Sequence, residues 1–320
     1  RETADDFTEF VTNKIGSERS FDEVHITFYG GEPLLSKELI VYVSGKVKAL
    51  AERTGISFSS SLMTNGTLLT KDAAKELKAL GLKDVYITVD GLKTAHDRSR
   101  PFKGGSGSFD TIVGNILDGA GTIDILVGGN YTRSNFREFP ALLDYVYKKG
   151  LTPSLLSSVA FYPVVSESGE YAMPDFHEGC ISANEPWLVD ASLFLREEIL
   201  KRGYCTDRIT PGICMMEFGN NILVDYEGSI YKCPGLIGRT NYKIGHIRTG
   251  INDYRLSHNL NNWKNEECLD CSYLPLCFGG CRYMKLVRDG DMNGVDCKKP
   301  YFDAALESLV RQDIRFNLSG

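Results

Sequence analysis

The sequence lacks three features that would place it in common classes of protein. It has no apolar run of the about 20 residues that a membrane-spanning helix needs; its most apolar stretch, residues 151–165, is broken by Pro153 and Pro163. It has no basic run, and its formal net charge is −6, which argues against a nucleic-acid-binding surface. It has no signal-peptide pattern, so we expect a reducing, most simply cytoplasmic, location and no membrane partner.

The N-terminal half lacks the cysteines that a thiolate metal site would need. No cysteine precedes Cys180. The histidines show no metal-ligand spacing, so we treat all five as structural or surface residues: His25, His96, His177, His246 and His258. With 42% hydrophobic and 24% charged residues, the 320-residue chain has the composition of a globular protein with one large or two moderate domains.

The nine cysteines instead gather in the C-terminal half, and seven of them form a regular pattern. The pattern is Cys214, Cys233, the run Cys268-x2-Cys271-x5-Cys277-x3-Cys281, and Cys297. Thiolates at these separations can surround a soft metal centre but cannot all pair comfortably as disulfides. Seven or eight sulfur ligands suffice for two four-coordinate sites. The pattern therefore predicts two centres of a soft metal, iron or zinc, with a disulfide framework as the least favoured interpretation.

Short apolar segments alternate with amphipathic ones before residue 165. We expect a helix over residues 3–16, with Thr3 and Asp6 as a capping pair. The patterns then predict strands at 25–29, 58–64, 85–89, 123–127 and 155–164, and helices that begin near 39, 70, 108 and 134. This alternation predicts an α/β fold with a parallel sheet or barrel, whose functional loops follow the carboxyl ends of the strands. The expected domains are 1–165, a bridging region 166–205 that contains a helix, and a cysteine-rich domain 206–320.

One loop after the first predicted strand is suited to a polar ligand. Gly30-Gly31-Glu32-Pro33 would bring backbone N–H and C=O groups close to the ligand and offer a carboxylate to an ammonium group. The ordinary alternative is a glycine turn.

Several motifs together resemble one enzyme family. FYGGEPLL at 28–35, MTNGTLL at 63–69 and ITVDGLKTAHDRSRPFKGGSGSFDTI at 87–112 resemble, in the same order, segments of radical S-adenosylmethionine (radical SAM) enzymes. The cysteine pattern resembles the SPASM domain of the peptide-modifying members of that family. The resemblance implies a partial (β/α)6 TIM-like barrel, without its first strand here, followed by a SPASM domain with two auxiliary 4Fe-4S clusters.

The resemblance also implies roles for individual residues. It places the amino group of S-adenosylmethionine at Gly30, Gly31, Glu32 and Pro33, and the cofactor's methionine or ribose part near Thr88, Asp90 and Asn130, where a turn or a strand-end cap is the alternative. Arg100 or Lys103 could pair with the cofactor carboxylate, although a solvated loop charge is the simpler expectation. The first auxiliary cluster is assigned Cys214, Cys233 and Cys281, with Cys205 as fourth ligand, Cys180 in reserve, or an open position. The second is assigned Cys268, Cys271, Cys277 and Cys297.

The C-x3-C-x2-C motif of the family's catalytic cluster is absent from this sequence. In the family it precedes the GGEP loop, so we expect the chain to lack an N-terminal segment that would carry it and, with it, a third 4Fe-4S cluster.

The resemblance implies a maturase that forms thioether crosslinks in a ribosomally made precursor peptide, with flavodoxin or ferredoxin as electron donor. CSYLPLCFGGCR at 271–282 favours this reading, as does Pro234 after Cys233, where sulfatase maturases carry an aspartate. The alternatives are oxidation of the anaerobic sulfatase-maturase type and a non-catalytic iron–sulfur or zinc protein that binds a peptide or transfers electrons.

Overall fold

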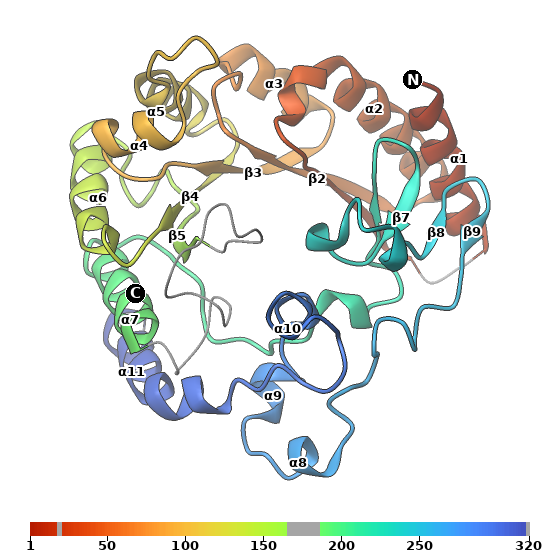
Figure 1. The fold of residues 1–320 in the computed structure, drawn as a ribbon. Coiled ribbons are helices and arrows are strands. Elements are labelled where there is room, and N and C mark those ends of the chain that lie inside the picture. The colour runs from red at the N-terminus through yellow and green to blue at the C-terminus, as the bar shows by residue number, and fades with distance from the viewer. Residues whose placement is uncertain (18–20, 165–185, 318–320) are drawn as a thin grey trace.

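A five-stranded parallel sheet organises the first half of the protein. The computed structural model describes residues 1–17, 21–164 and 186–317. The strands lie side by side in chain order: β1 (Glu23–Phe28), β2 (Ser57–Thr64), β3 (Leu82–Thr88), β4 (Asp124–Tyr131) and β5 (Ser158–Pro163). All neighbouring pairs are parallel. The predicted α/β alternation is therefore confirmed, and each predicted strand overlaps an observed one (Figure 1).

Helices cover the convex side of this sheet. They are α1 (Glu2–Ser17), α2 (Lys37–Thr54), α3 (Lys71–Ala79), α4 (Lys93–Ser99), α5 (Phe109–Gly119), α6 (Phe139–Lys148) and α7 (Pro186–Lys201). Thr70 caps α3 by accepting a hydrogen bond from Ala73 N–H, as its sequence position predicts. The helix expected from residue 134 begins later, because the 3-10 turn η2 (Phe136–Glu138) precedes α6. In the described part of the chain, no helix combines the length and apolar character needed to cross a membrane.

The two faces of the sheet differ in chemistry because strand side chains alternate. Val24, Ile26 and Phe28 of β1 pack with α1 and α2 on the convex face. The intervening positions face the concave side, where β3 carries Tyr86 beside Gly128 of β4. A Cβ on Gly128 would lie 1.7 Å from the Tyr86 hydroxyl, so glycine makes the room that the tyrosine ring occupies.

The C-terminal region, residues 206–317, contains a small antiparallel sheet and four helices. The strands are β6 (Leu223–Val224), β7 (Ser229–Tyr231), β8 (Gly245–His246) and β9 (Gly250–Ile251). The helices are α8 (Glu266–Leu269), α9 (Leu274–Cys277), α10 (Arg282–Asp289) and α11 (Lys299–Asn317). In Figure 1 this region faces the sheet and lies across from it, so that the molecule forms a ring.

The C-terminal region contacts the N-terminal half on two sides, near β1 and near β5, and these contacts complete the ring. On the β1 side, Phe10 of α1 is buried with Ile230, Ile244 and Ile247 of the small sheet. Arg248 adds ion pairs to Asp6 at 2.6 Å and Glu2 at 2.5 Å. Asp6 therefore serves this contact, and its predicted capping pair with Thr3 is wrong, since the helix already begins at Glu2.

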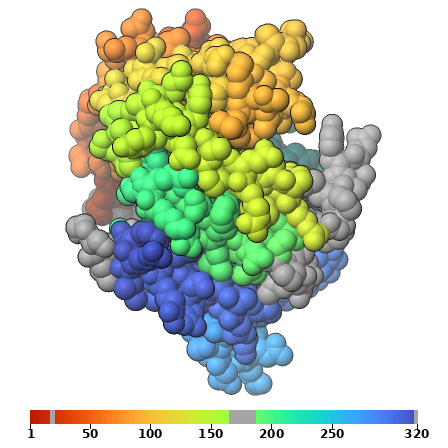
Figure 2. All heavy atoms as spheres, turned by 90° about the vertical axis from the view of Figure 1, so that its left-hand side faces the viewer, coloured from red at the N-terminus to blue at the C-terminus, as the bar shows by residue number. Residues whose placement is uncertain are grey.

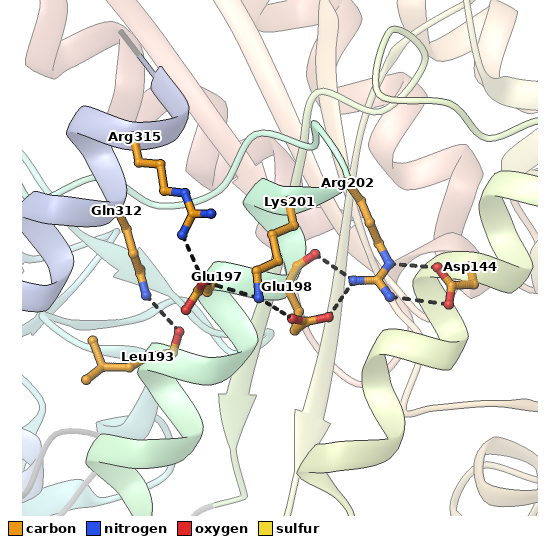
Figure 3. A network of polar contacts seen from close by, with 8 residues as sticks. All are labelled: Asp144, Leu193, Glu197, Glu198, Lys201, Arg202, Gln312 and Arg315. Carbon is orange, nitrogen blue, oxygen red and sulfur yellow. Dashed lines mark hydrogen bonds and ion pairs between the residues drawn. The ribbon is translucent and has the colours of Figure 1, made fainter. Parts of the chain in front are cut away.

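On the β5 side, α11 packs against α7. Figure 2 shows α7 (green) between α6 and α11 (blue) on that face. The buried contact is apolar and involves Val189, Tyr301, Phe302, Ala305 and Leu309. In the network of Figure 3, Gln312 of α11 donates to the Leu193 carbonyl of α7 at 3.0 Å, while Arg202 joins Glu198 of α7 and Asp144 of α6 at 2.7 Å each. The docking of α11 on α7 therefore combines the apolar contact with polar contacts, among them the ion pair between Arg196 and Asp313 at 2.5 Å.

Truncation of Phe10 tests the docking on α1. Phe10→Ala should lower the free energy of unfolding by about 3 kcal/mol, because it leaves a cavity between α1 and the small sheet. Phe218→Ala, at a side chain that is 49% exposed, is the matched control and should cost much less. Urea denaturation followed by circular dichroism measures both, and equal losses would show that Phe10 does not anchor the contact.

Candidate functional site

The carboxyl ends of β1 to β4 bring the predicted cofactor residues to one edge of the sheet. Gly30 to Pro33 follow β1, Thr88 and Asp90 lie at the end of β3, and Asn130 lies near the end of β4. Because these strands are neighbours and parallel, their loops open on the same side of the molecule.

Glu32 ties the ends of β1 and β2 together. Its Oε1 accepts hydrogen bonds from the Leu34 N–H at 3.0 Å and the Thr64 hydroxyl at 2.7 Å. Its Oε2 accepts one from the Asn65 N–H at 2.8 Å. Three of about four acceptor sites on the carboxylate are thus used inside the protein. Glu32 chiefly orders the loop, and sequence reasoning missed its partners Thr64 and Asn65.

The two glycines ahead of Glu32 face open space. A Cβ built on Gly30 or Gly31 would meet no atom within 4 Å, and both residues are exposed. Packing within the protein therefore does not require glycine here, unlike at Gly128. An open, side-chain-free backbone is suited to close approach by a ligand.

Asp90 joins β3, β4 and the following loop. Its Oδ1 accepts hydrogen bonds from the Asn130 backbone N–H at 2.7 Å and from Asn130 Nδ2 at 3.1 Å. Its Oδ2 pairs with Arg100 Nε. The expectation that Arg100 is a solvated loop charge is therefore wrong. Asp90, Asn130 and Arg100 form one ordered polar group at the strand ends.

His96 fastens the loop that carries Arg100. Its Nδ1 accepts from the Asp90 N–H at 3.1 Å, so the proton of the neutral ring is on Nε2, which lies 3.1 Å from the Ser108 hydroxyl. Ser108 in turn donates to the Arg100 carbonyl at 2.6 Å. The ring is fully buried, and this burial lowers the pKa of His96 from 6.5.

A second polar group lies on the concave face. Tyr162 of β5 donates to Asp207 at 2.7 Å. Burial raises the pKa of Tyr86 to about 12, with smaller contributions from the charges of Asp207 and Asp90. Asp207 thus brings a carboxylate from the C-terminal region to the interior of the ring.

The cysteines of the C-terminal region separate into two groups. Burial raises the pKa of the Cys277 thiol, and the Gly279 N–H lowers it. The nearby thiols of Cys268, Cys297 and Cys271 also raise this pKa. We call Cys277 and these three cysteines the second cysteine group. Burial raises the pKa of Cys281 to about 11, the Met284 N–H lowers it, and the Cys214 thiol raises it. Cys214 and Cys233 pack against one apolar cluster. We call Cys214, Cys233 and Cys281 the first cysteine group, following the sequence-based assignment.

The backbone around these groups suits sulfur ligands. Phe278, Gly279 and Gly280 have φ of 42°, 80° and 74°, three left-handed residues in succession that bend the chain between Cys277 and Cys281. A Cβ on Gly280 would lie 1.9 Å from the Asp296 carbonyl oxygen. The backbone N–H groups of Gly279 and Met284 lower the pKa of the Cys277 and Cys281 thiols, and so favour their thiolate forms. Within the described residues, no three His, Cys, Asp or Glu side chains converge tightly enough for a single metal ion.

Cys205 lies elsewhere. It is exposed, its carbonyl accepts from the Val159 N–H at 2.8 Å, and it lines a surface pocket with Asp124 and Ser157 at the amino ends of β4 and β5. The fourth ligand of the first cysteine group stays a prediction. Cys180 and His177 lie outside the described residues.

A buried ion pair holds the first cysteine group together. Arg282, directly after Cys281, has a fully buried side chain and pairs with Glu217, three residues after Cys214. Arg282 Nε also donates to the Asn259 carbonyl at 2.9 Å, and Nη2 lies 3.1 Å from Asn262 Oδ1. The pair therefore joins the segments of two cysteines that are far apart in the sequence.

The His96 contacts predict a pH dependence. A histidine whose folded pKa lies below 6.5 contributes stability that is present above pH 6.5 and is lost as pH falls toward the folded pKa, because the unfolded chain then binds the extra proton. The slope is at most about 1.4 kcal/mol per pH unit. His96→Gln should flatten the decline measured by urea denaturation between pH 7.5 and 5.5 (about two units). Burial also lowers the pKa of His258, which keeps its contribution in both proteins; equal slopes would contradict the assignment to His96.

Removal of one partner of the Glu217–Arg282 pair should be severe. Arg282→Met should destabilise the C-terminal region by about 3–5 kcal/mol, because it leaves a buried carboxylate unpaired. Glu217→Leu combined with Arg282→Met should recover part of that loss. Arg255→Met, at a pair that is 80% and 73% exposed, is the control and should change stability by less than about 0.5 kcal/mol. If Arg282→Met lowers the stability only slightly, the Glu217–Arg282 pair does not hold the first cysteine group together.

Comparisons with known proteins agree with the architecture. Residues 11–139 match the Radical SAM superfamily. The Fe-coproporphyrin III synthase of Methanosarcina barkeri is 32% identical over 46% of this chain and 33% of its own length. The cysteine-type anaerobic sulfatase-maturating enzyme of Clostridium novyi is 24% identical over 91% of this chain and 84% of its own. Mycofactocin maturase MftC of Mycolicibacterium smegmatis is 26% identical over 88% and 72%.

A solved structure shares the fold. It is described as native anSMEcpe with bound AdoMet and Kp18Cys peptide, with a TM-score of 0.72, 18% identity, and coverage of 98% of this chain and 90% of that one. The sequence match covers β1 to β4 and the loops at their carboxyl ends. Residues 11–139 of this chain are therefore a radical SAM domain.

Proposed function

We propose that the protein is a radical SAM enzyme that modifies a ribosomally made peptide, with thioether formation as the reaction. The observation that carries the proposal is the open glycine loop at the strand-end edge, in one chain with the seven-cysteine pattern of the C-terminal region. Relatives whose names describe peptide or protein maturation align over most of the chain, which supports a peptide as substrate.

S-adenosylmethionine would bind at the strand-end edge. The free backbone of Gly30 and Gly31 faces the open side, Pro33 fixes the turn, and Glu32 holds it to β2. Thr88, Asp90 and Asn130 would receive the ribose or methionine part, with Asp90 and Asn130 pre-oriented by each other and Arg100 balancing the carboxylate charge. The cluster that cleaves the cofactor would require the C-x3-C-x2-C motif, which this sequence does not contain.

The two cysteine groups would hold auxiliary 4Fe-4S clusters. The first group supplies three thiolates and leaves one position for Cys205, Cys180 or a substrate thiolate, and the second supplies four. When bound, such clusters accept an electron and bind a thiolate. The chain itself contributes backbone N–H groups that favour the thiolate forms, a ring that limits water, and Asp207 and Tyr86 inside it as groups able to hold or pass a proton.

Oxidation of the sulfatase-maturase type is the second candidate. The sulfatase-maturating relative and the structural neighbour favour it. Pro234 opposes it, because the position after Cys233 lacks the aspartate that the resemblance associates with that reaction. A non-catalytic iron–sulfur or zinc protein is the third candidate. It is less favoured because such a protein would not need the open glycine loop as a cofactor site.

The test uses the protein expressed from its native coding sequence and purified without oxygen. Iron, acid-labile sulfide and zinc per chain are measured together with 5'-deoxyadenosine formed from S-adenosylmethionine and dithionite. We expect about twelve irons, as three 4Fe-4S clusters, and reductive cleavage. Zinc without iron, or clusters without cleavage, would refute the proposal.

Variants then separate the two sites. Cys271→Ala should lose one cluster and destabilise the C-terminal region, because metal binding contributes to folding. Glu32→Ala should weaken S-adenosylmethionine binding about tenfold, equivalent to about 1.4 kcal/mol, and keep its iron. With cysteine-containing test peptides, loss of two hydrogens and of the free thiol indicates a thioether, whereas replacement of the thiol by an aldehyde indicates the oxidation.

A further inference from the structure

Three buried polar atoms in the described part of the chain have no hydrogen-bond partner. They are Nε2 of His258, Nη1 of Arg282 and the hydroxyl oxygen of Tyr283. All three lie in the C-terminal region, and two belong to the residues that directly follow Cys281. An unsatisfied buried polar group is destabilising, so a further group within hydrogen-bond reach would stabilise each of these atoms.

The Tyr283 ring connects two segments of the first cysteine group. It packs against the same apolar cluster as Cys214 and Cys233. Its hydroxyl-bearing end covers Gly235, where an added Cβ would lie 2.5 Å from Tyr283 Cζ. Gly235 is two residues after Cys233, and Tyr283 is two residues after Cys281. The hydroxyl is therefore held beside the segments of both cysteines, and a larger residue at Gly235 would displace it.

We propose that the Tyr283 hydroxyl donates a hydrogen bond to the iron–sulfur cluster held by Cys214, Cys233 and Cys281 and raises its reduction potential. The inference rests on the iron–sulfur part of the proposed function. Cluster sulfides and thiolates accept hydrogen bonds, and such bonds are among the factors that set cluster potentials. A reduced cluster carries one more negative charge, so a donor stabilises the reduced form more than the oxidised one.

Arg282 is less suited to this role, although one of its nitrogens is also without a partner. Its Nε and Nη2 are held by Asn259, Asn262 and Glu217, which fix the guanidinium against the loop at 259–262. Tyr283 has no competing partner, and its ring is the one packed with the cysteines.

The test is Tyr283→Phe in the full-length protein loaded with iron and sulfide without oxygen. Iron content should be unchanged. The redox transition that disappears in Cys214→Ala should move to a more negative potential, with the reduction equilibrium changing about tenfold, or about 59 mV for one electron. Electron-nuclear double resonance of the reduced cluster should show a solvent-exchangeable proton in the wild type that is missing in the variant.

Tyr204→Phe is the matched control. Tyr204 is 2% exposed, but its hydroxyl already donates to the Leu151 carbonyl at 2.6 Å within the core around the five-stranded sheet. This variant should lose stability and keep every cluster potential.

Three outcomes would overturn the inference. If Tyr283→Phe keeps its full iron content, its cluster potential and its exchangeable proton signal, the inference about Tyr283 is refuted. The proposed function would still be supported in that case by cleavage of the cofactor. Loss of iron from Tyr283→Phe would make the tyrosine a ligand and not a donor. A wild-type protein without any iron–sulfur cluster would refute both this inference and the proposed function.

Discussion

The arrangement of the protein depends on helix α1 being packed on two sides. One side covers β1 and α2, and the other receives the small sheet through Phe10 and its isoleucine partners. Together with the contact between α7 and α11, this holds the C-terminal region across from the concave face. The two sides of the five-stranded sheet are thus joined by the C-terminal region through these two contacts.

The strand-end edge is ordered by polar side chains that bind each other. Glu32 links β1 to β2, and Asp90 links β3 to β4 and to the loop of Arg100. Each carboxylate is mostly satisfied within the protein, and each fixes a loop. What remains free toward the open side is backbone, at Gly30 and Gly31. Such a site can receive a ligand without paying to reorganise, which is how preorganised sites gain affinity.

Periodicity and motif order predicted much of this, and their failures have physical causes. The strands and most helices were predictable because apolar alternation over buried segments is strong. The Thr3–Asp6 pair and the solvated Arg100 were wrong, because in both cases a charge has a partner distant in sequence: Asp6 pairs with Arg248, and Arg100 with Asp90. The roles of Thr64, Asn65 and His96 could not be predicted from the sequence either. Their hydrogen bonds to Glu32 and Asp90 form only once the chain has folded. The assignment of cysteines to two clusters and the domain limits stay predictions.

Asp296 gives the two cysteine groups a common support. It precedes Cys297 of the second group, and its Oδ2 accepts the Cys281 N–H of the first at 3.1 Å, while Arg288 and Lys298 pair with its carboxylate at 3.0 Å and 2.8 Å. These partners hold the Asp296 carboxylate in place, so one residue sets the position of the backbone of both groups relative to each other. A substitution at Asp296 would therefore disturb both groups at once, although Asp296 is adjacent in sequence to only one of them.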